Sequence, residues 1–274
     1  MHDAPLVSCL MVTRQRLAMA KRAIDCYAAQ DYDARELVIV CDGEGDRDTL
    51  ERYAATRCGQ RVTVTEHRLG SLSLGALRNT AIALARGGVI CQWDDDDLSH
   101  PLRLSHQVEL MLAEHADGCF MTDQLHLMAR TGSLYWCDWA RPHGRPLPWP
   151  TIPNTLLCRK DAIDPYPESG PLSRRSEDAY VMRSLLKRKR VSRLGGHGWL
   201  YVYVCHGANT WHEGHHLDIV RATGMTAREL LHRKGELAAA MSSHTLGDLV
   251  VRDETGLEVY RIATSGVAGA ASHG

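Results

Sequence analysis

The sequence predicts an α/β protein whose Rossmann-like, mostly parallel sheet is flanked by helices. In the first hundred residues, apolar runs of strand length alternate with segments whose apolar residues recur at helical spacing. The runs at residues 6–12, 36–41 and 88–93 are apolar on both faces, as in parallel strands that helices cover on both sides. These two features together favour a doubly wound architecture.

The predicted elements of the first half form a continuous β-α-β-α-β-α-β unit. They are a strand at 6–12, a helix at 18–30, a strand at 36–41, a helix at 47–56, a strand at 61–67, a helix at 74–85 and a strand at 88–93. The second half is less regular. Its predicted elements are a helix around Leu104 and Val108, strands at 118–129, 132–140 and 155–163, helices at 176–190 and near 226–241, and a short β segment at the end. We expect the Pro- and Trp-rich loop at 142–153 to form a lid or a wall of the site.

The composition argues against several classes of protein. Of 274 residues, 32 are Lys or Arg and 33 are Asp or Glu, so the chain lacks the basic excess of a nucleic-acid-binding protein. No apolar run approaches about 18 residues and no secretory leader is recognisable, so we expect no membrane span and a cytoplasmic location. The nine cysteines are scattered without a C-x-x-C pair, which favours reduced, mostly buried thiols.

Four consecutive aspartates, residues 94–97, directly follow the apolar run at 88–93. Burying like charges together costs several kcal/mol each unless a cation or hydrogen-bond donors compensate. Carboxylate oxygens suit a hard divalent cation such as Mg²⁺ or Mn²⁺, which often also binds substrate phosphates. The alternative is an acidic cap on a helix that starts at Leu102, but a cap explains one or two aspartates rather than four.

Polar residues also follow the other predicted strands. "TRQR" at 13–16 follows the first strand and "DGEGD" at 42–46 follows the second, so three loops converge with the aspartates on the carboxyl edge of the sheet. No G-x-G-x-x-G or G-x-x-x-x-G-K-[ST] motif follows the first strand. A bound phosphate therefore needs a metal ion and side chains to hold it.

The order of these motifs resembles that of the family 2 glycosyltransferases of the GT-A fold. The resemblance is carried by "TRQR", "VIVCDG", "LGALRNTAIALARGGVICQWDDDDLSHPLRL", "SEDAYVMRSLL" and "CHGANTW", and it covers about residues 5–216. It implies a mixed, mostly parallel sheet in a domain at 1–216, with a nucleotide-sugar-binding half at 1–105 and an acceptor half at 106–216. Residues 217–274 are then a small helical and β extension.

The resemblance implies a metal site that binds Mn²⁺ or Mg²⁺. Asp94, Asp95 and Asp96 resemble the D-x-D element, with Asp96 as the metal ligand and Asp94 nearer the ribose or sugar, although the run of four leaves the register open by one residue. His206, which follows an apolar run, resembles the histidine that completes the metal shell in members of this fold.

The same resemblance implies a donor pocket. Asp42 is similar to the carboxylate that accepts the imide N–H of uracil or thymine, Thr13 and Arg16 line the nucleotide pocket, and Arg78 faces the diphosphate. The "SED" at 176–178 matches the catalytic pair of the family.

On the acceptor side, Asp178 is the expected base of an inverting transfer, and Glu177 is expected to hold an acceptor hydroxyl. Asn154 and Trp211 are expected to bind the acceptor, and Ser176 to cap the helix. The alternative for the two acids is that they merely decorate a helix N-terminus.

We therefore expect a metal-dependent, inverting glycosyltransferase that uses a nucleoside-diphosphate sugar, with UDP or dTDP favoured by Asp42. The acceptor is a sugar, a lipid-linked sugar or a small molecule, and the tail from Leu217 is available for a homodimer contact.

Three alternative functions explain less of the sequence. "HEGHH" satisfies H-E-x-x-H through His212, Glu213 and His216, as in a zinc hydrolase, but Gly214 lies inside the motif and the context favours a turn rather than a helix. A sugar-nucleotide nucleotidyltransferase needs a glycine-rich loop that "TRQR" lacks. A sugar-binding module needs no base, although Glu177 and Asp178 are present.

Overall fold

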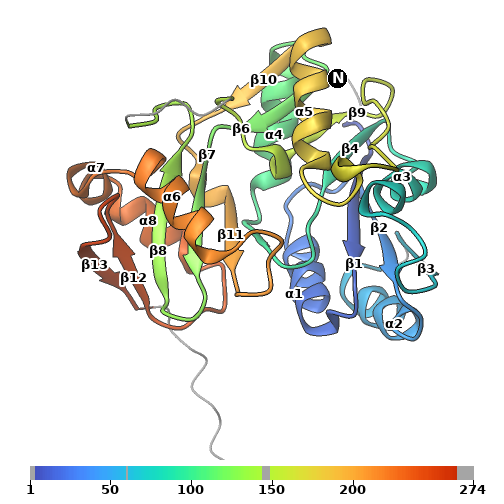
Figure 1. Ribbon diagram of the computed structural model, residues 1–274, viewed down its shortest axis with the longest axis horizontal. Coiled ribbons are helices and arrows are strands. Elements are labelled where there is room, and N and C mark those ends of the chain that lie inside the picture. Colours follow the sequence, from blue (N-terminus) through green and yellow to red (C-terminus); the bar gives the residue numbers. More distant parts are fainter. Residues whose placement is uncertain (1–3, 60, 144–148, 264–274) are drawn as a thin grey trace, which may run out of the picture.

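The computed structural model describes residues 4–59, 61–143 and 149–263, and the strands of these residues form two sheets that lie side by side (Figure 1). The first sheet has the strand order β10-β6-β9-β4-β1-β2-β3. Its strands are β1 (Val7–Thr13), β2 (Arg35–Asp42), β3 (Val62–His67), β4 (Val89–Gln92), β6 (Gly118–Met121), β9 (Leu157–Arg159) and β10 (Val191–Leu194). Within this sheet β9 is antiparallel to both of its neighbours and the other paired strands are parallel, so the predicted mixed, mostly parallel sheet is confirmed.

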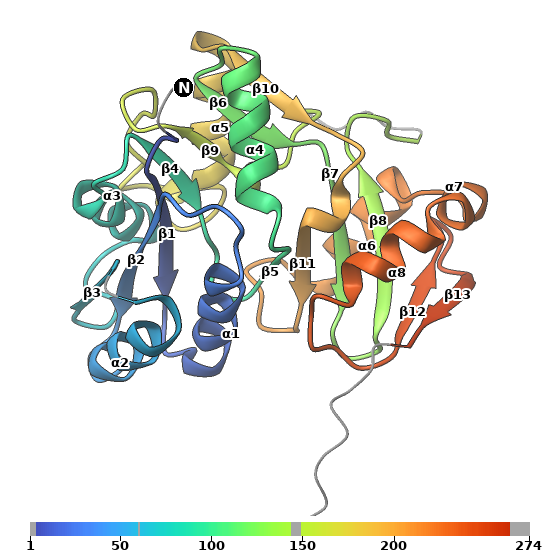
Figure 2. The same cartoon turned by 180° about the vertical axis from the view of Figure 1, so that it is seen from behind.

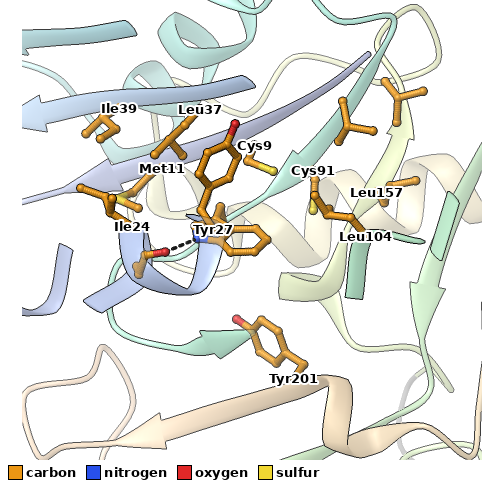
Figure 3. Close-up of a cluster of buried hydrophobic side chains, with 14 of the residues drawn as sticks. Cys9, Met11, Ile24, Tyr27, Leu37, Ile39, Cys91, Leu104, Leu157 and Tyr201 are labelled. Carbon is orange, nitrogen blue, oxygen red and sulfur yellow. Dashed lines mark hydrogen bonds between the residues drawn. The ribbon is translucent and has the colours of Figure 1, made fainter. Parts of the chain in front are cut away.

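Helices cover both faces of the first sheet. They are α1 (Leu17–Ala28), α2 (Arg47–Cys58), α3 (Leu74–Leu84), α4 (Arg103–Ala113) and α5 (Glu177–Arg188). Helices α1, α2 and α4 share one core cluster with alternate residues of β1 and β2, whereas α3 and α5 share another with the intervening residues. Figure 3 shows the first cluster, in which Ile24 and Tyr27 of α1 face Met11 and Leu37 of the strands. The two-sided burial explains why these strands read as continuous apolar runs.

The second sheet has the strand order β13-β12-β8-β7-β11-β5. Its strands are β5 (Leu98–Ser99), β7 (Asp123–Met128), β8 (Ser133–Asp138), β11 (Tyr201–Cys205), β12 (Leu249–Arg252) and β13 (Glu258–Ile262). Helices α7 (Ala227–His232) and α8 (Lys234–Met241) pack on one face of it, and α6 (Glu213–Thr223) packs on the other, which Figures 1 and 2 show from opposite sides. Short 3-10 helices at Pro153–Thr155, Pro171–Ser173 and Gly198–Leu200 complete the described elements.

The strand predicted at 118–129 is wrong, because the chain leaves the first sheet at Thr122 and enters the second. Strand β6 pairs with β10 and β9, whereas β7 pairs with β8 and β11. The backbone N–H of Thr122 still bonds to Leu194, and its carbonyl accepts from Trp139 near the end of β8. A single apolar run thus joins the two sheets.

Other differences lie in the second half. Strands β5 and β10 and helix α6 were not predicted, and the helix predicted near 226–241 is two helices, α7 and α8. Helix α4 begins at Arg103 with Leu102 at its N-cap, and β5 separates it from the aspartates, so the acidic-cap alternative is wrong.

The domain boundary at 216 stays a prediction. Strand β12, from beyond this boundary, hydrogen-bonds β8, from before it, so the expected extension continues the second sheet. No helix of the described residues is long and apolar enough to cross a membrane. The nine cysteines are free thiols, and Cys26 and Cys58 are the two that are not fully buried.

Candidate active site

A cavity of about 890 Å³ opens where the carboxyl ends of β1, β2 and β4 meet the second sheet. All the predicted site residues except His206 line it. They are Thr13, Arg16, Asp42, Arg78, Asp94, Asp95, Asp96, Asn154, Glu177, Asp178 and Trp211. The loop expected at 142–153 contributes Trp149 and Pro153 to the wall, and its residues 144–148 lie outside the described residues.

Asp96 and His206 lie together, as predicted. The Nε2 of His206 is 3.1 Å from Oδ2 of Asp96, and Nη1 of Arg16 donates to the same oxygen at 2.8 Å. Hydrogen bonding from His206 and the charge of Arg16 lower the pKa of Asp96 against the opposing effect of burial. The structure therefore keeps a negative charge at this position.

Asp95 and Asp97 are held in different ways. Asp95 accepts a hydrogen bond from the Thr13 hydroxyl at 2.7 Å, and burial together with the charge of Asp96 raises its pKa to about 7. Asp97 turns away into the protein, where it accepts hydrogen bonds from the Tyr201 hydroxyl and, at 2.8 Å, from the backbone N–H of Val204. Because these donors satisfy Asp97, the first three aspartates are the ones available to a ligand.

The donor atoms around Asp96 fit a hard or borderline divalent ion. Carboxylate oxygens and one imidazole are ligands that Mn²⁺ accepts, and a cation here would offset the repulsion from Asp96 that, after burial, raises the pKa of Asp95. In the described part of the chain no third acid or histidine joins Asp96 and His206 in a close three-ligand group. Ions such as Mg²⁺ are often held in this way, by one or two protein ligands with waters and substrate phosphates in the remaining positions.

Arg78 links the aspartates to the start of α5. It projects from α3, donates from Nη2 to Asp94 at 3.2 Å and from Nε to Glu177 at 3.0 Å, and lies over the ring of Tyr166. Its side chain is 12% exposed, so both ion pairs are largely shielded from water. Arg78 thus lies between the aspartates at 94–96 and the expected catalytic pair, Glu177 and Asp178.

The two acids at the start of α5 have different surroundings. Glu177 is 3% exposed and paired with Arg78, whereas Asp178 is partly exposed to the cavity, with Oδ1 accepting only from the adjacent N–H of Ala179. Burial, followed by the charge of Glu177, raises the pKa of Asp178 to about 7, and Arg78 opposes the shift. A carboxylate with this pKa is suited to accept a proton near neutral pH.

Ser176 occupies the N-cap position of α5 but makes no capping hydrogen bond through its side chain, so the predicted cap is wrong. Its φ of 62° lies in the left-handed region, which costs a non-glycine residue about 1 kcal/mol or more. Strain of this kind persists where the surrounding structure enforces it, and here it immediately precedes Glu177 and Asp178.

The remaining predicted residues, Asp42, Asn154 and Trp211, also line the cavity. Asp42 ends β2, accepts from the N–H of Gly70 at 2.6 Å and has Arg14 3.5 Å from its other oxygen. Asn154 donates to the hydroxyl of Tyr201 at 3.0 Å. Trp211 is 36% exposed and stacks on His215, with ring centroids 4.6 Å apart.

The cavity also contains residues that the sequence analysis did not identify. Gln124 and His126 line it from β7, Tyr203 from β11, and Arg175 lies over the Trp211 ring at 4.8 Å. The signal for the first two was the alternation of polar and apolar residues in "DQLHLM", which indicates a strand with one polar face. Arg175 carried no signal beyond its proximity to "SED".

The "HEGHH" segment forms a helix, contrary to our expectation, but not a zinc-hydrolase helix. His212 is the exposed N-cap of α6, and its side chain accepts from the N–H of His215 at 3.2 Å. Glu213 pairs with the exposed Arg130 at 3.3 Å, whereas His216 is buried. The two histidines therefore do not share a helical face as the motif requires.

Residues 8–131 match the family described as Glycosyl transferase family 2. The chain is 38% identical over 105 residues to WcaA, a glycosyl transferase assigned to colanic acid biosynthesis in Escherichia coli, across 38% of this chain and 37% of that protein. It is 28% identical over 107 residues to an uncharacterized glycosyltransferase of Rickettsia felis, across 39% of this chain and 17% of that protein. The chain thus spans less than two fifths of either relative.

Solved structures share the fold over most of the described chain. TarS of S. aureus superposes with a TM-score of 0.56 and 18% identity over 87% of this chain and 71% of its own. The mannosyltransferase PcManGT of Pyrobaculum calidifontis superposes with a TM-score of 0.56 and 14% identity over 80% of this chain and 62% of its own. Residues 8–131 are therefore similar to the family 2 glycosyltransferases, and the described chain shares the GT-A fold with these solved structures.

Proposed function

We propose that this protein transfers a sugar from a nucleoside-diphosphate donor to an acceptor hydroxyl with inversion at the anomeric carbon. The observation that carries the proposal is a line of groups in one cavity, from Asp96 through Asp94 and Arg78 to Glu177 and Asp178, with His206 behind it in contact with Asp96. Charge stabilisation for a leaving diphosphate lies at one end of this line, and a proton acceptor lies at the other.

The site favours a donor whose nucleotide carries a pyrimidine base. Asp42 closes the end of the cavity at β2, and its Oδ2, which faces the exposed Arg14, is available to accept an imide N–H. TarS has been crystallised with UDP and with UDP-GlcNAc, which supports UDP, whereas PcManGT has been crystallised with GDP-Man and Mn²⁺. Guanine is the alternative base, and the donor panel described below therefore includes GDP-sugars.

The residues divide the chemistry between them. Asp96 and His206 would hold a divalent ion, which supplies positive charge to the departing diphosphate. Arg78 adds a guanidinium on the same side, and fixed charges of this kind contribute several kcal/mol. Asp178 takes the proton from the acceptor hydroxyl as that oxygen attacks the anomeric carbon, and Glu177, paired with Arg78, positions the arginine.

The test is a panel of UDP-, dTDP- and GDP-sugars with Mn²⁺, Mg²⁺ or EDTA, in which nucleoside diphosphate release is measured with the full chain. We expect release from a pyrimidine donor that requires the metal, and an acceptor product of inverted anomeric configuration by NMR. Release of pyrophosphate from a nucleoside triphosphate and a sugar phosphate would instead identify a nucleotidyltransferase.

The metal assignment is tested separately by calorimetry. Asp96→Ala is expected to abolish the metal-dependent part of UDP binding, because it removes the carboxylate that meets His206. Asp161→Ala, at an exposed position, is the control and should bind UDP as the unchanged chain does. Equally tight UDP binding in EDTA and in Mn²⁺ would contradict the assignment.

A further inference from the structure

Three potential metal ligands that are far apart in the sequence meet on one face of the second sheet. His126 comes from β7, Cys205 ends β11, and His216 lies on α6, and one ligand atom from each lies within 4.8 Å of the others. Their exposures are 1%, 7% and 4%. The alternation of side chains along β7 and β11 turns His126 and Cys205 toward α6, while Leu125 and Val204 face α7 and α8.

Three of the four histidine nitrogens in this group have no hydrogen-bond partner among the described residues. Nδ1 of His126 and both ring nitrogens of His216 are buried and unpaired, and the backbone of Trp211 lies near the His216 ring without a well-formed bond. A buried polar atom without a partner costs about 1–3 kcal/mol. Native proteins rarely leave several such atoms side by side, so the grouping of these nitrogens points to a ligand that they share.

The protonation states suit ligation. Burial, together with repulsion between the two rings, lowers the pKa of His126 to about 3. Burial likewise lowers the pKa of His216 to about 4, with His215 adding to the effect. Both imidazoles are therefore neutral at pH 7, which is the form that binds a metal. Cys205 would release its thiol proton to solvent when an ion binds and would bond as the thiolate.

Gln124 completes the arrangement from the neighbouring position on β7. Its amide nitrogen lies 2.8 Å from Nε2 of His126, and its Oε1 has no partner. Turning the amide over would let Oε1 accept the Nε2–H of His126 and leave a lone pair on Nδ1. A hydrogen bond of this type orients a ligating histidine in many metal sites.

We propose that His126, Cys205 and His216 bind a transition-metal ion of the zinc class, which attaches α6 to the second sheet beside Trp211. Two imidazoles and a thiolate suit Zn²⁺ or Co²⁺ rather than Mg²⁺. In a tetrahedral zinc site, ligand atoms of this kind lie about 3.5 Å apart. Side-chain rotations that move each ligand atom by about 1 Å would bring the three atoms to this spacing. The site is separate from Asp96 and does not depend on the proposed transferase activity.

An ion at this site would hold α6 in place beside the cavity. His126 and His216 line the same cavity as Trp211, so the remaining coordination position faces the cavity. Helix α6 lies across the face of the second sheet in Figure 1, and it follows directly from the Trp211 loop. An ion that joins α6 to β7 and β11 would therefore order the wall on which we expect the acceptor to rest.

The experiment uses the full chain after dialysis against a chelator, titrated with Co²⁺ and followed by absorption spectroscopy. We expect one equivalent to produce the visible bands of tetrahedral cobalt and a thiolate-to-cobalt band in the near ultraviolet. Zn²⁺ should displace the cobalt and raise the melting temperature. Asp96→Ala should give the same spectra, which separates this site from the proposed donor site.

The variants decide whether these residues are the ligands. Cys205→Ala should lose the thiolate band and weaken zinc binding at least about 100-fold, whereas Cys137→Ala, a buried cysteine on the same face, should keep both. Gln124→Ala should weaken zinc binding about 10- to 100-fold. If Cys205→Ala does not fold, His216→Gln on α6 takes its place.

The neutral alternative is that the two histidines simply pack against Tyr203, whose ring lies 4.8 Å from that of His216. An unchanged chain that takes up no cobalt with a thiolate band, or a Cys205→Ala variant with the same spectrum and affinity, would overturn the proposal.

Discussion

At the scale of single residues, two adjacent carboxylates acquire different properties from their neighbours. Glu177 is buried, and its Oε1 accepts a hydrogen bond from Nε of Arg78 at 3.0 Å. Asp178 lines the cavity, and burial, followed by the charge of Glu177, keeps its pKa high although Arg78 opposes the shift. The difference arises from position on the helix rather than from residue type, and it favours Asp178 as the base.

Replacement of Asp178 by Asn is expected to lower turnover by about two or more orders of magnitude, the usual loss when a general base is removed. UDP binding should be unchanged, because Arg78 lies between Asp178 and the aspartates that we expect to bind the diphosphate and its metal ion. Steady-state kinetics and calorimetry on the same preparation check both parts. Asp161→Asn, at an exposed site, is the matched control, and near-normal turnover in Asp178→Asn would remove it from the mechanism.

The pH dependence of turnover follows from the same residue. Because the pKa of Asp178 is raised to about 7, lowering the pH below 7 protonates the base, and turnover should fall about tenfold per pH unit. Above pH 7 the carboxylate is charged and the rate should level off. A pH-rate profile with saturating donor measures this limb, and a flat profile between pH 5 and 8 would argue against a titrating base.

At the scale of elements, helix α3 positions Arg78 by packing tightly on residues 166–168. The N-cap hydroxyl of Ser73 donates to the carbonyl of Glu168 at 3.0 Å, and a Cβ at Gly75 would lie 1.9 Å from the carbonyl oxygen of Pro167. Only a glycine permits this approach. Arg78 lies one turn further along α3, so the close contact helps to fix the guanidinium between its two acids.

Two glycines at the second position of their helices give a matched pair of variants. Gly75→Ala is expected to destabilise the protein by about 1–3 kcal/mol and to reduce turnover, because the backbone of residue 167 must shift. Gly235→Ala in α8, where a Cβ meets nothing within 4 Å, should be neutral or stabilising by up to about 1 kcal/mol. Urea unfolding measures the stability of both variants. If Gly75→Ala is as stable as Gly235→Ala, the backbone at residue 167 can shift without cost and the proposed constraint on α3 is wrong.

At the scale of the whole molecule, the residues beyond 216 are part of the second hydrophobic core. Strand β12 covers the edge of β8, and α7 and α8 cover the face that carries Leu134 and Trp136, which are 0% and 1% exposed. Large apolar surfaces of this kind are not left open in stable monomers. The cavity therefore depends on a sheet that the last part of the described chain completes.

A chain shortened to residues 1–216 is expected to aggregate or to lose cooperative unfolding, because it exposes this core. A chain shortened to residues 1–263 keeps every described element and should unfold as the full chain does. Size-exclusion chromatography and thermal denaturation by circular dichroism distinguish the two. A monomeric, cooperatively unfolding 1–216 fragment would support the boundary that the sequence suggested.

The meeting of the strand-end residues in one cavity was predictable because these residues obey a local rule. Thr13, Asp42 and Asp94 follow parallel strands, and polar residues at such strand ends meet at one edge of the sheet. The chain crossing at Thr122 was not predictable in the same way, because an apolar run carries no mark of the sheet to which it belongs. The periodic pattern is the same on either side of the crossing.

The order of strands, helices and strand-end acids in the first half was determined by the sequence alone, since apolar periodicity and local turns depend on neighbouring residues. Tertiary structure decided which of the four aspartates turns inward, that Glu177 pairs with Arg78, and that His126, Cys205 and His216 meet. These outcomes depend on contacts between residues up to about a hundred positions apart. Such contacts are set by how the two sheets pack, and no local pattern encodes that packing.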